Sequence, residues 1–332
     1  MIAPENKRPI ELVGVINSFN RRALLEKAVS SLLPALREAP FGSAVVVFEA
    51  GSADGSKEFL ESWLQRNPND CLTVIAPLPG QTSFSDGVNA GCATALAQYP
   101  ECRWLFLYET DNWLANVEPL TAAISLLQAQ PRLGAAGFTV RQHQGNRCGY
   151  GMRFPGWLSL ALGQNLASRS NLARPNDSNW QVTDNVRWRI CDVVFTSPLL
   201  IRRETWEQIG GFDVQAFPFS DSDLDWAWRC AKADWKMAVI ASDAVVHDNR
   251  EQLSAWSANR VIDFHRSRLR LLKRHRGNRR AALIKPILFL RHCLETLWLA
   301  CRLGGDAKAR AKLAKRRQLL RTVWSDYRQA SR

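Results

Sequence analysis

The sequence predicts an α/β fold: a mostly parallel, mixed sheet with helices on both faces, followed by a basic helical extension. Three observations support this prediction. Short apolar runs alternate with helix-like segments over the first 110 residues, which is typical of parallel sheets. The chain has 332 residues, of which 46% are hydrophobic, enough for one or two globular domains. Residues 251–332 hold 21 Lys and Arg against 5 Asp and Glu, whereas residues 1–250 hold 23 against 26.

The first 110 residues repeat a strand, a polar turn and a helix. Apolar runs predict strands at 12–16, 44–48, 72–76 and 104–108. Helices are predicted at about 24–36, at 57–65 and from about residue 86. Carboxylates follow the second and fourth strands, namely Glu49, Asp54, Glu109 and Asp111. Because parallel α/β sheets bind ligands at the carboxyl ends of their strands, this clustering is the first indication of function.

Residues 141–190 break the pattern, because glycines and prolines interrupt them. Such a long irregular segment predicts a lid or an acceptor-binding loop. Regular structure is expected again as a strand at 192–201, helices at 205–209 and 224–236, and a strand at 237–240. Gly210 suits the left-handed end of the short helix. We therefore predict one domain over residues 1–257, which contains the irregular loop, and a basic amphipathic helical extension over 258–332.

Three aspartates at alternate positions, Asp221, Asp223 and Asp225, form the segment around which the predicted site is organised. Crowded carboxylates are costly in a folded protein unless a cation or a reaction uses them. Asp225 precedes Arg229 by four residues, a spacing that predicts a structural ion pair on one helix face. Asp223 is then left for chemistry, although it could instead cap the helix that begins near Leu224.

Residues 258–332 predict three helices, at 261–273, at about 281–303 and at 307–327. In the middle helix an apolar stripe is flanked by Lys285, Arg291 and Arg302. The stripe consists of Ile287, Leu290, Leu294, Leu297, Trp298 and Cys301. Such a helix can lie in the surface of an anionic membrane. The alternative is packing on the body or on a second subunit, as in a homo-oligomer, and nucleic acid is the least favoured partner.

The first nine residues contain no apolar block, and no apolar run approaches the roughly 20 residues of a membrane-spanning helix. These observations predict a cytoplasmic location, with peripheral attachment to the cytoplasmic face of the inner membrane as the further expectation. The eight cysteines include no CxxC pair, which argues against a zinc site and for reduced thiols.

Taken in order, these motifs resemble those of family-2 glycosyltransferases, which have the GT-A (Rossmann-like) fold. The matching pieces are Ser18-Phe19-Asn20-Arg21, Glu49 to Ser56, Asn89-Ala90-Gly91, Glu109-Thr110-Asp111, Arg203-Glu204 through Gly210-Gly211-Phe212-Asp213, the aspartate run, and Asp243 to His247. The resemblance covers roughly residues 10–250. It implies inverting transfer of a sugar from a nucleotide-diphosphate sugar to an acceptor hydroxyl, with Mg²⁺ or Mn²⁺. With the basic tail, it also suggests a lipid-linked or cell-envelope glycan as the acceptor.

The resemblance implies a role for each matching residue. Glu49 corresponds to the acid that reads the nucleobase, and Asp54 lies near the nucleoside. Asp111 corresponds to the metal-binding aspartate of a DxD-like motif that Glu109 opens, and His247 to the histidine that completes the metal or pyrophosphate site. The other expected donor-binding residues are Ser18, Asn20, Arg21 and Asn89. Trp188, in the irregular loop, is the candidate for acceptor contact.

The general base is assigned by register. In the family an arginine follows the last aspartate by four residues, so Arg229 identifies Asp225 as that aspartate. The base is then Asp223, with Asp221 as the alternative. Structural interpretations compete with several of these roles. Asp111 could cap a helix, His247 could be a packed histidine, and the acids that follow the second strand could be ordinary turn residues.

Three residues depart from the family's pattern. Ser222 replaces the acid that usually precedes the base, and Glu109 replaces a more usual Asp or Asn. Asp234 stands where the family has glycine. The first two departures suggest an alternative function, a non-catalytic homologue that binds a nucleotide-sugar or a glycan.

Overall fold

The computed structural model describes residues 8–142, 145, 147–156, 159, 180–247, 260–302 and 307–329. The chain divides into two compact units. One consists of residues 1–153 and 175–249, and the other of residues 154–174 and 250–332. We describe each unit by itself.

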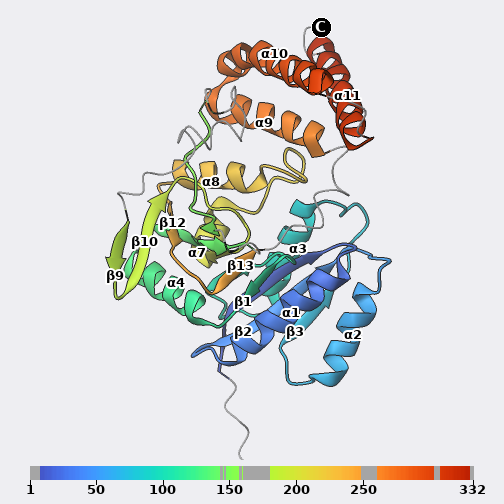
Figure 1. Cartoon of the computed structure of the whole chain (residues 1–332). Helices are drawn as coiled ribbons and strands as arrows, with labels where there is room; N and C mark the ends of the chain where they lie inside the picture. The colour runs from blue at the N-terminus through green and yellow to red at the C-terminus, as the bar shows by residue number, and fades with distance from the viewer. Residues whose placement is uncertain are drawn as a thin grey trace, which may run out of the picture. The chain divides into compact units, whose positions relative to one another are not determined.

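The first unit contains a nine-stranded mixed sheet with the order β3-β2-β1-β4-β11-β6-β12-β10-β9 (Figure 1). Its strands are β1 (Ile10–Ser18), β2 (Gly42–Glu49), β3 (Leu72–Ile75), β4 (Trp104–Leu107), β6 (Leu133–Phe138), β9 (Gln181–Thr183), β10 (Val186–Cys191), β11 (Leu199–Arg202) and β12 (Lys236–Ile240). The neighbours β3, β2, β1 and β4 are parallel, as are β6 and β12. β11 runs antiparallel between β4 and β6. The predicted mixed α/β sheet is therefore confirmed.

Helices pack on both faces of this sheet. They are α1 (Arg22–Arg37), α2 (Ser56–Arg66), α3 (Phe84–Gln98), α4 (Glu118–Ala129), α7 (Arg203–Ile209) and α8 (Ser222–Lys232). A Cβ atom added to Gly14 of β1 would meet Leu32 of α1 at 3.2 Å, whereas Gly91 of α3 packs against Val15 of β1. Successive strand residues point to opposite faces. It follows that α1 and α3 cover opposite faces of the sheet.

A second, four-stranded sheet has the order β5-β13-β7-β8. Its strands are β5 (Asn112–Leu114), β13 (Val245–His247), β7 (Val140–Arg141) and β8 (Arg147–Cys148). β13 pairs antiparallel with β5, so that His247 lies opposite Asn112. This pairing places the Asp243–His247 motif beside the segment that follows β4.

The structure corrects two expectations for the middle of the chain. The strand predicted at 192–201 is wrong for most of its length, because β10 ends at Cys191 and β11 begins at Leu199. Pro198, just before β11, has no N–H for a ladder hydrogen bond. The irregular segment predicted at 141–190 is also partly wrong, since β8, β9 and most of β10 lie within it. Residues 143, 144, 146, 157, 158 and 160–179 of that segment lie outside the described residues.

The second unit contains the three predicted helices, α9 (Arg260–Arg276), α10 (Asn278–Arg302) and α11 (Ala307–Gln329), coloured orange to red in Figure 1. Ile284 and Leu288 of α10 pack with Leu272 of α9. Leu319 and Val323 of α11 are buried in a second small apolar cluster. Across the part of the chain that the structure describes, no helix is both long enough and apolar enough to cross a bilayer.

Helix α8 ends four residues before the predicted end, at Lys232, in a left-handed turn. Asp234 has φ +62°, and its N–H donates to the Ala231 oxygen at 3.3 Å. The Trp235 N–H donates to the Cys230 oxygen at 3.0 Å. This pair of bonds defines a Schellman cap, whose left-handed position favours glycine. The geometry explains why the family's pattern has glycine where this chain has Asp234.

We expect Asp234→Gly to raise the free energy of unfolding by about 0.5–1 kcal/mol, because glycine adopts a left-handed conformation without steric strain. Asp234→Ala should lower it by about 1 kcal/mol, since alanine lacks the polar group that helps aspartate to tolerate this conformation. Urea unfolding of the three proteins measures both changes. A stability order with alanine above glycine would contradict this account of the cap.

Candidate active site

The loops after β1 and β2 are neighbours, because the two strands are parallel and paired to their last residues. Ser18 lies in register with Glu49, and both side chains are buried. Glu49 accepts the N–H groups of Gly51 at 3.1 Å and Ser52 at 2.8 Å, so it stabilises its own turn. The Ser18 hydroxyl has no hydrogen-bond partner among the described residues. Because a buried hydroxyl without a partner is unfavourable, Ser18 is available to a ligand.

Asn20 and Asp54 tie the two loops together. The Asn20 side-chain oxygen accepts the Ala53 N–H at 2.8 Å. The Asp54 carboxylate accepts the Arg22 N–H at 2.7 Å, and from Ser56 it accepts the hydroxyl at 2.6 Å and the N–H at 3.1 Å. Partial burial raises the pKa of Asp54, but these hydrogen bonds outweigh it and hold the pKa below its usual value. Both side chains therefore set the shape of the loops, and their contacts with a donor stay predictions.

Asp111 lies two residues beyond Glu109, in the segment that links β4 to β5. Its carboxylate is buried, and its Oδ1 makes no hydrogen bond within the described part of the chain. Burial, followed by the negative charge of Glu109, raises the pKa of Asp111 to about 6 against the opposing effects of His247 and Arg21. The protein alone thus leaves this negative charge poorly compensated, as expected for a carboxylate that holds a cation.

His247 reaches Asp111 from β13. Its Nδ1 lies 3.4 Å from Asp111 Oδ1 and 3.0 Å from the Asn112 side-chain oxygen. The Asn112 amide nitrogen donates to the Glu109 backbone oxygen at 3.2 Å, which orients its own oxygen toward His247. Because Nδ1 faces two acceptor atoms, it carries the proton, and Nε2 is left to accept from or bind a ligand. The structure thus brings together two predicted metal ligands far apart in sequence.

These residues fit the divalent cation that the family's pattern implies. Carboxylate oxygens suit Mg²⁺ and Mn²⁺, and an imidazole nitrogen suits Mn²⁺. Among the described residues, no three His, Cys, Asp or Glu side chains form a complete metal-binding group. A cation at Asp111 would therefore complete its coordination with water and phosphate oxygens, as Mg²⁺ commonly does.

Glu109, the other predicted metal ligand, is engaged by a residue that the sequence did not indicate. The Thr196 hydroxyl donates a hydrogen bond to Glu109 Oε1. Thr196 is buried and lies just before β11, whose pairing with β4 brings it to this position. Asn112 was likewise missed as the partner of His247, although it directly follows the acidic motif.

The aspartate run forms the start of α8. Asp221 occupies the N-cap position with a left-handed backbone, φ +60°, and its side chain makes no capping hydrogen bond. Asp223 lies in the first turn, where one of its oxygens accepts the Leu224 N–H at 2.9 Å. The helix begins at Ser222, so the interpretation of Asp223 as the cap is wrong. Asp223 therefore lies at the N-terminal end of α8, where the helix dipole is positive.

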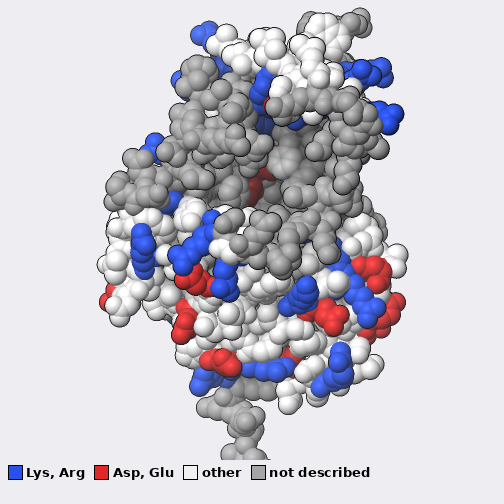
Figure 2. Space-filling model, viewed as in Figure 1, with Lys and Arg blue, Asp and Glu red and all other residues white. Residues whose placement is uncertain are grey.

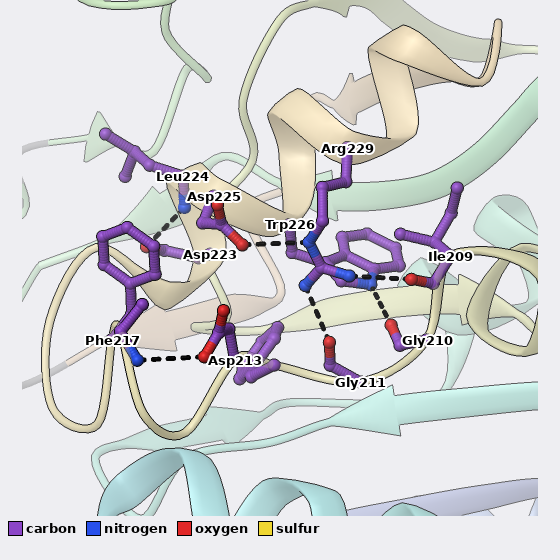
Figure 3. A network of polar contacts seen from close by, with 12 residues as sticks. Ile209, Gly210, Gly211, Asp213, Phe217, Asp223, Leu224, Asp225, Trp226 and Arg229 are labelled. Atoms are coloured by element: carbon purple, nitrogen blue, oxygen red, sulfur yellow. Dashed lines mark hydrogen bonds and ion pairs between the residues drawn. The ribbon is translucent and has the colours of Figure 1, made fainter. Parts of the chain in front are cut away.

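The predicted ion pair between Asp225 and Arg229 is present, and Figure 3 shows its surroundings. Arg229 Nε lies 2.9 Å from Asp225 Oδ2, and the carboxylate is fully buried. The two other guanidinium nitrogens donate to the backbone oxygens of Ile209 and Gly211, both at 2.7 Å. The Trp226 indole N–H adds a bond to the neighbouring Gly210 oxygen at 3.0 Å. The pair therefore fixes the turn after α7 against the first turns of α8.

Helix α3 holds the loop that connects this turn to α8. The Asn89 amide donates to the Phe212 oxygen at 2.9 Å and accepts the Phe212 N–H at 2.8 Å. The Ser85 hydroxyl donates to the Phe217 oxygen at 2.6 Å. Both polar groups of the Asn89 side chain are thus used within the protein. The contact of Asn89 with a donor stays a prediction.

Trp188 lies in β10 rather than in an irregular loop. Its side chain is buried in the main apolar core, and its indole N–H donates to the Thr183 hydroxyl at 3.1 Å. The contact of Trp188 with an acceptor likewise stays a prediction. Arg21, another predicted donor-binding residue, lies 3.5 Å from the Thr110 hydroxyl, beside the acidic motif.

The sequence and the fold were compared with known proteins. A family model described as "Glycosyltransferase like family 2" matches residues 11–261. The chain is 27% identical over 270 residues to an N-acetylglucosaminyl-diphospho-decaprenol L-rhamnosyltransferase of Mycobacterium tuberculosis, covering 72% of this chain and 78% of the relative. This protein recurs in two strains of that organism.

Two solved structures share the fold at low sequence identity. The mannosyltransferase PcManGT from Pyrobaculum calidifontis, in complex with GDP-Man and Mn²⁺, gives a TM-score of 0.53 at 15% identity, over 95% of this chain and 86% of that one. GalNAc-T7 with UDP, GalNAc and Mn²⁺ gives 0.52 at 11% identity, over 74% of this chain and 44% of that one. These likenesses establish the GT-A fold.

We expect Asp111→Asn to raise the free energy of unfolding at pH 7.5, without divalent cations, by roughly 1–3 kcal/mol. Burial raises the pKa of Asp111 in the folded protein to about 6, above the ordinary value of 3.8, so its ionisation destabilises the fold as the pH rises through this range. Below pH 3.8 the aspartate is protonated in both states, and the gain should vanish. Urea unfolding at pH 7.5 and at about pH 3.5 measures the difference. The exposed Asp243 supplies the control Asp243→Asn, and an equal gain there would contradict the prediction.

We expect Arg229→Met to lower the free energy of unfolding by about 3–5 kcal/mol, because it removes the counter-charge of a fully buried carboxylate. The matched control is Lys57→Met, which breaks an exposed pair with Glu61 at the same i, i+4 spacing and should change stability by less than about 1 kcal/mol. Urea unfolding measures both. Similar losses in the two variants would show that the Arg229 network does not stabilise the fold.

Proposed function

The chain belongs to glycosyltransferase family 2, and from this premise we propose that it transfers a sugar, with inversion, from a nucleotide-diphosphate sugar to a hydroxyl of a lipid-linked glycan acceptor. Sugar transfer itself follows from the family. The donor, the acceptor and the inverting course are our proposal. The observation that carries it is the buried Asp111 carboxylate, whose Oδ1 has no hydrogen bond within the described residues and faces His247.

We assign the nucleoside half of the donor to the ends of β1 and β2. Ser18 contributes a buried hydroxyl that can bond to the donor, and Glu49 lies beside it in register. Asn20 and Asp54 keep the two loops in place through their bonds to backbone groups. The nucleoside then lies next to β4, the strand that leads to Asp111, because β1 pairs with both β2 and β4.

We assign the diphosphate to the segment after β4. Asp111 and Glu109 would hold the divalent cation, with His247 Nε2 directed to the cation or to the pyrophosphate. When bound, Mg²⁺ or Mn²⁺ supplies positive charge that offsets the negative charge developing on the leaving nucleoside diphosphate. Arg21, whose charge acts on Asp111 and which lies beside Thr110, would be a second positive group near the phosphates.

We assign the role of general base to Asp223. Its carboxylate takes the proton of the acceptor hydroxyl while the hydroxyl oxygen forms a bond to the anomeric carbon of the donor sugar. The bond from that carbon to the diphosphate oxygen breaks on the opposite face, so the configuration inverts. The position of Asp223 is set by α8, which the Asp225–Arg229 pair ties to the preceding turn. A base in this position typically contributes ~10²–10⁴-fold to the rate.

The acceptor class rests on the rhamnosyltransferase relative, whose name specifies an N-acetylglucosaminyl-diphospho-decaprenol acceptor. We propose that this chain also acts on a saccharide linked through diphosphate to a polyprenol, with a hexose or deoxyhexose as the transferred sugar. Such a step belongs to the synthesis of a cell-envelope polysaccharide, at the cytoplasmic face of the membrane.

The alternative is a homologue that binds a nucleotide-sugar or glycan without transferring it. Two observations favour it. Ser222 is buried where the family has an acid before the base, and one Glu109 oxygen is engaged by Thr196. A panel of UDP-, GDP- and dTDP-sugars with Mn²⁺ separates the two functions: thermal stabilisation without transfer or hydrolysis of any donor would favour the binding protein.

With a donor found in that panel and an N-acetylglucosaminyl-diphospho-polyprenol acceptor, we expect Asp223→Asn to lower kcat by ~10²–10⁴-fold. Donor-dependent thermal stabilisation should persist, because the base contacts the acceptor. The matched control is Asp221→Asn, since asparagine tolerates the left-handed backbone of Asp221. A larger kcat loss in the control would identify Asp221 as the base, and equal activity of Asp223→Asn and the parent would remove Asp223 from the mechanism.

A further inference from the structure

One side of α10 exposes large apolar side chains to solvent. They are Leu283, Ile287, Leu290, Leu294, Leu297 and Trp298, between 41% and 72% exposed, and we call them the α10 face. At 100° per residue, they lie within an arc of about 100° on the helix. The α10 face contains the stripe predicted from the sequence except Cys301, which is also exposed, and adds Leu283 one turn toward the N-terminus.

The other side of α10 is already used for packing. Ala281, Ile284 and Leu288 are buried in a cluster with Leu272 of α9. The α10 face is therefore additional to the apolar surface that holds the three helices together. Soluble proteins rarely leave so large and continuous an apolar surface in water, and such surfaces mark binding sites for proteins or membranes.

The charge of these helices favours one kind of partner. The described residues 260–302 and 307–329 hold 20 Lys and Arg against 3 Asp and Glu. Arg279 and Arg280 are exposed one turn before Leu283, at the end of the α10 face. Figure 2 shows basic side chains at the margins of the uncharged surface around α10 and α11. An apolar face bordered by cations fits an interfacial helix on a membrane with anionic lipids.

A second copy of the chain fits less well. Pairing two α10 faces would bring together two strongly basic units, which repel each other. Coiled-coil partners usually compensate such charges with acidic residues beside the seam. Among the described residues of α10 the one acid is Glu295, and it already pairs with Arg316 at 2.8 Å.

We propose that the α10 face docks on an anionic lipid surface, with the helix lying in the plane of the interface. The leucines and Ile287 enter the acyl boundary, Trp298 sits at the headgroup level, and Arg279 and Arg280 contact lipid phosphates. This inference concerns a different unit from the proposed transfer site. It holds whichever sugar is transferred, and its test requires no activity.

The whole 332-residue chain is tested by co-sedimentation with vesicles of phosphatidylcholine, and of phosphatidylcholine mixed with phosphatidylglycerol. We expect binding to the anionic vesicles at least ~10-fold stronger than to the neutral ones at about 0.1 M salt. The triple variant Leu290→Gln, Leu294→Gln and Leu297→Gln should lose at least ~10-fold in partition. The double variant Arg279→Gln and Arg280→Gln should lose roughly 10-fold on anionic vesicles alone.

The matched control is Val182→Gln, which removes an exposed apolar side chain from β9 and should leave partition unchanged. All substituted residues are exposed, and circular dichroism checks that helix content is retained. Undiminished binding of the triple variant would overturn the proposal, as would equal binding to neutral vesicles. Absence of vesicle binding would overturn it too, and a dimer in sedimentation equilibrium that the triple variant dissociates would identify a second copy as the partner.

Discussion

The buried carboxylate of Asp225 is the constraint on which the arrangement of α7 and α8 depends. A fully buried negative charge is tolerated only with a partner, and Arg229 supplies it from the next turn of α8. The same guanidinium also binds the backbone oxygen of Ile209, which has no partner within α7 because the helix ends there, and the oxygen of Gly211, two residues further on. One side chain therefore neutralises a charge, closes a helix terminus and orients the next helix. The direction in which Asp223 points follows from this arrangement, and any change that loosens it also moves the proposed base.

Asp111 shows the opposite balance of forces. Asp225 has a permanent internal partner. Asp111 Oδ1 instead faces His247, whose Nδ1 also faces the Asn112 side-chain oxygen, and burial raises the pKa of Asp111. The two carboxylates are both buried in one unit, but only one is electrostatically satisfied without a ligand. The protein thus balances the charge of Asp225 internally and that of Asp111 only in part. A buried carboxylate without a full internal counter-charge gains more from a bound cation than one that is already paired.

The sequence predicts the parts of the fold in which local pattern and tertiary environment agree. β1, β2, α1 and the three basic helices follow from periodicity, and the spacing of Asp225 and Arg229 predicts their ion pair. β6 was not predicted, because it contains two glycines, which are uncommon inside strands. Their lack of a side chain allows close packing, of Gly134 against Thr205 and of Gly137 against Val194.

β10 escaped for a different reason. Its two arginines resemble loop residues, yet the Arg189 side chain is buried and donates to the Tyr150 oxygen at 2.6 Å. In the candidate site, the sequence motifs predict the acidic residues but not the residues that hydrogen-bond to them and affect their pKa. Thr196 reaches Glu109 only because β11 runs antiparallel to β4, and no local pattern encodes that pairing. A sequence motif therefore does not determine the protonation or the orientation of its side chains. Tertiary contacts determine both.

The uneven charge of the chain is consistent with a division of labour between its two units. A transferase that acts on a polyprenol-linked acceptor meets that acceptor only at a membrane surface, where the lipid is concentrated in two dimensions. A basic unit with an apolar helix face would hold the enzyme at that surface, so that finding the acceptor becomes a local rather than a bulk search. Surface attachment and donor chemistry can then be optimised by different residues of one chain.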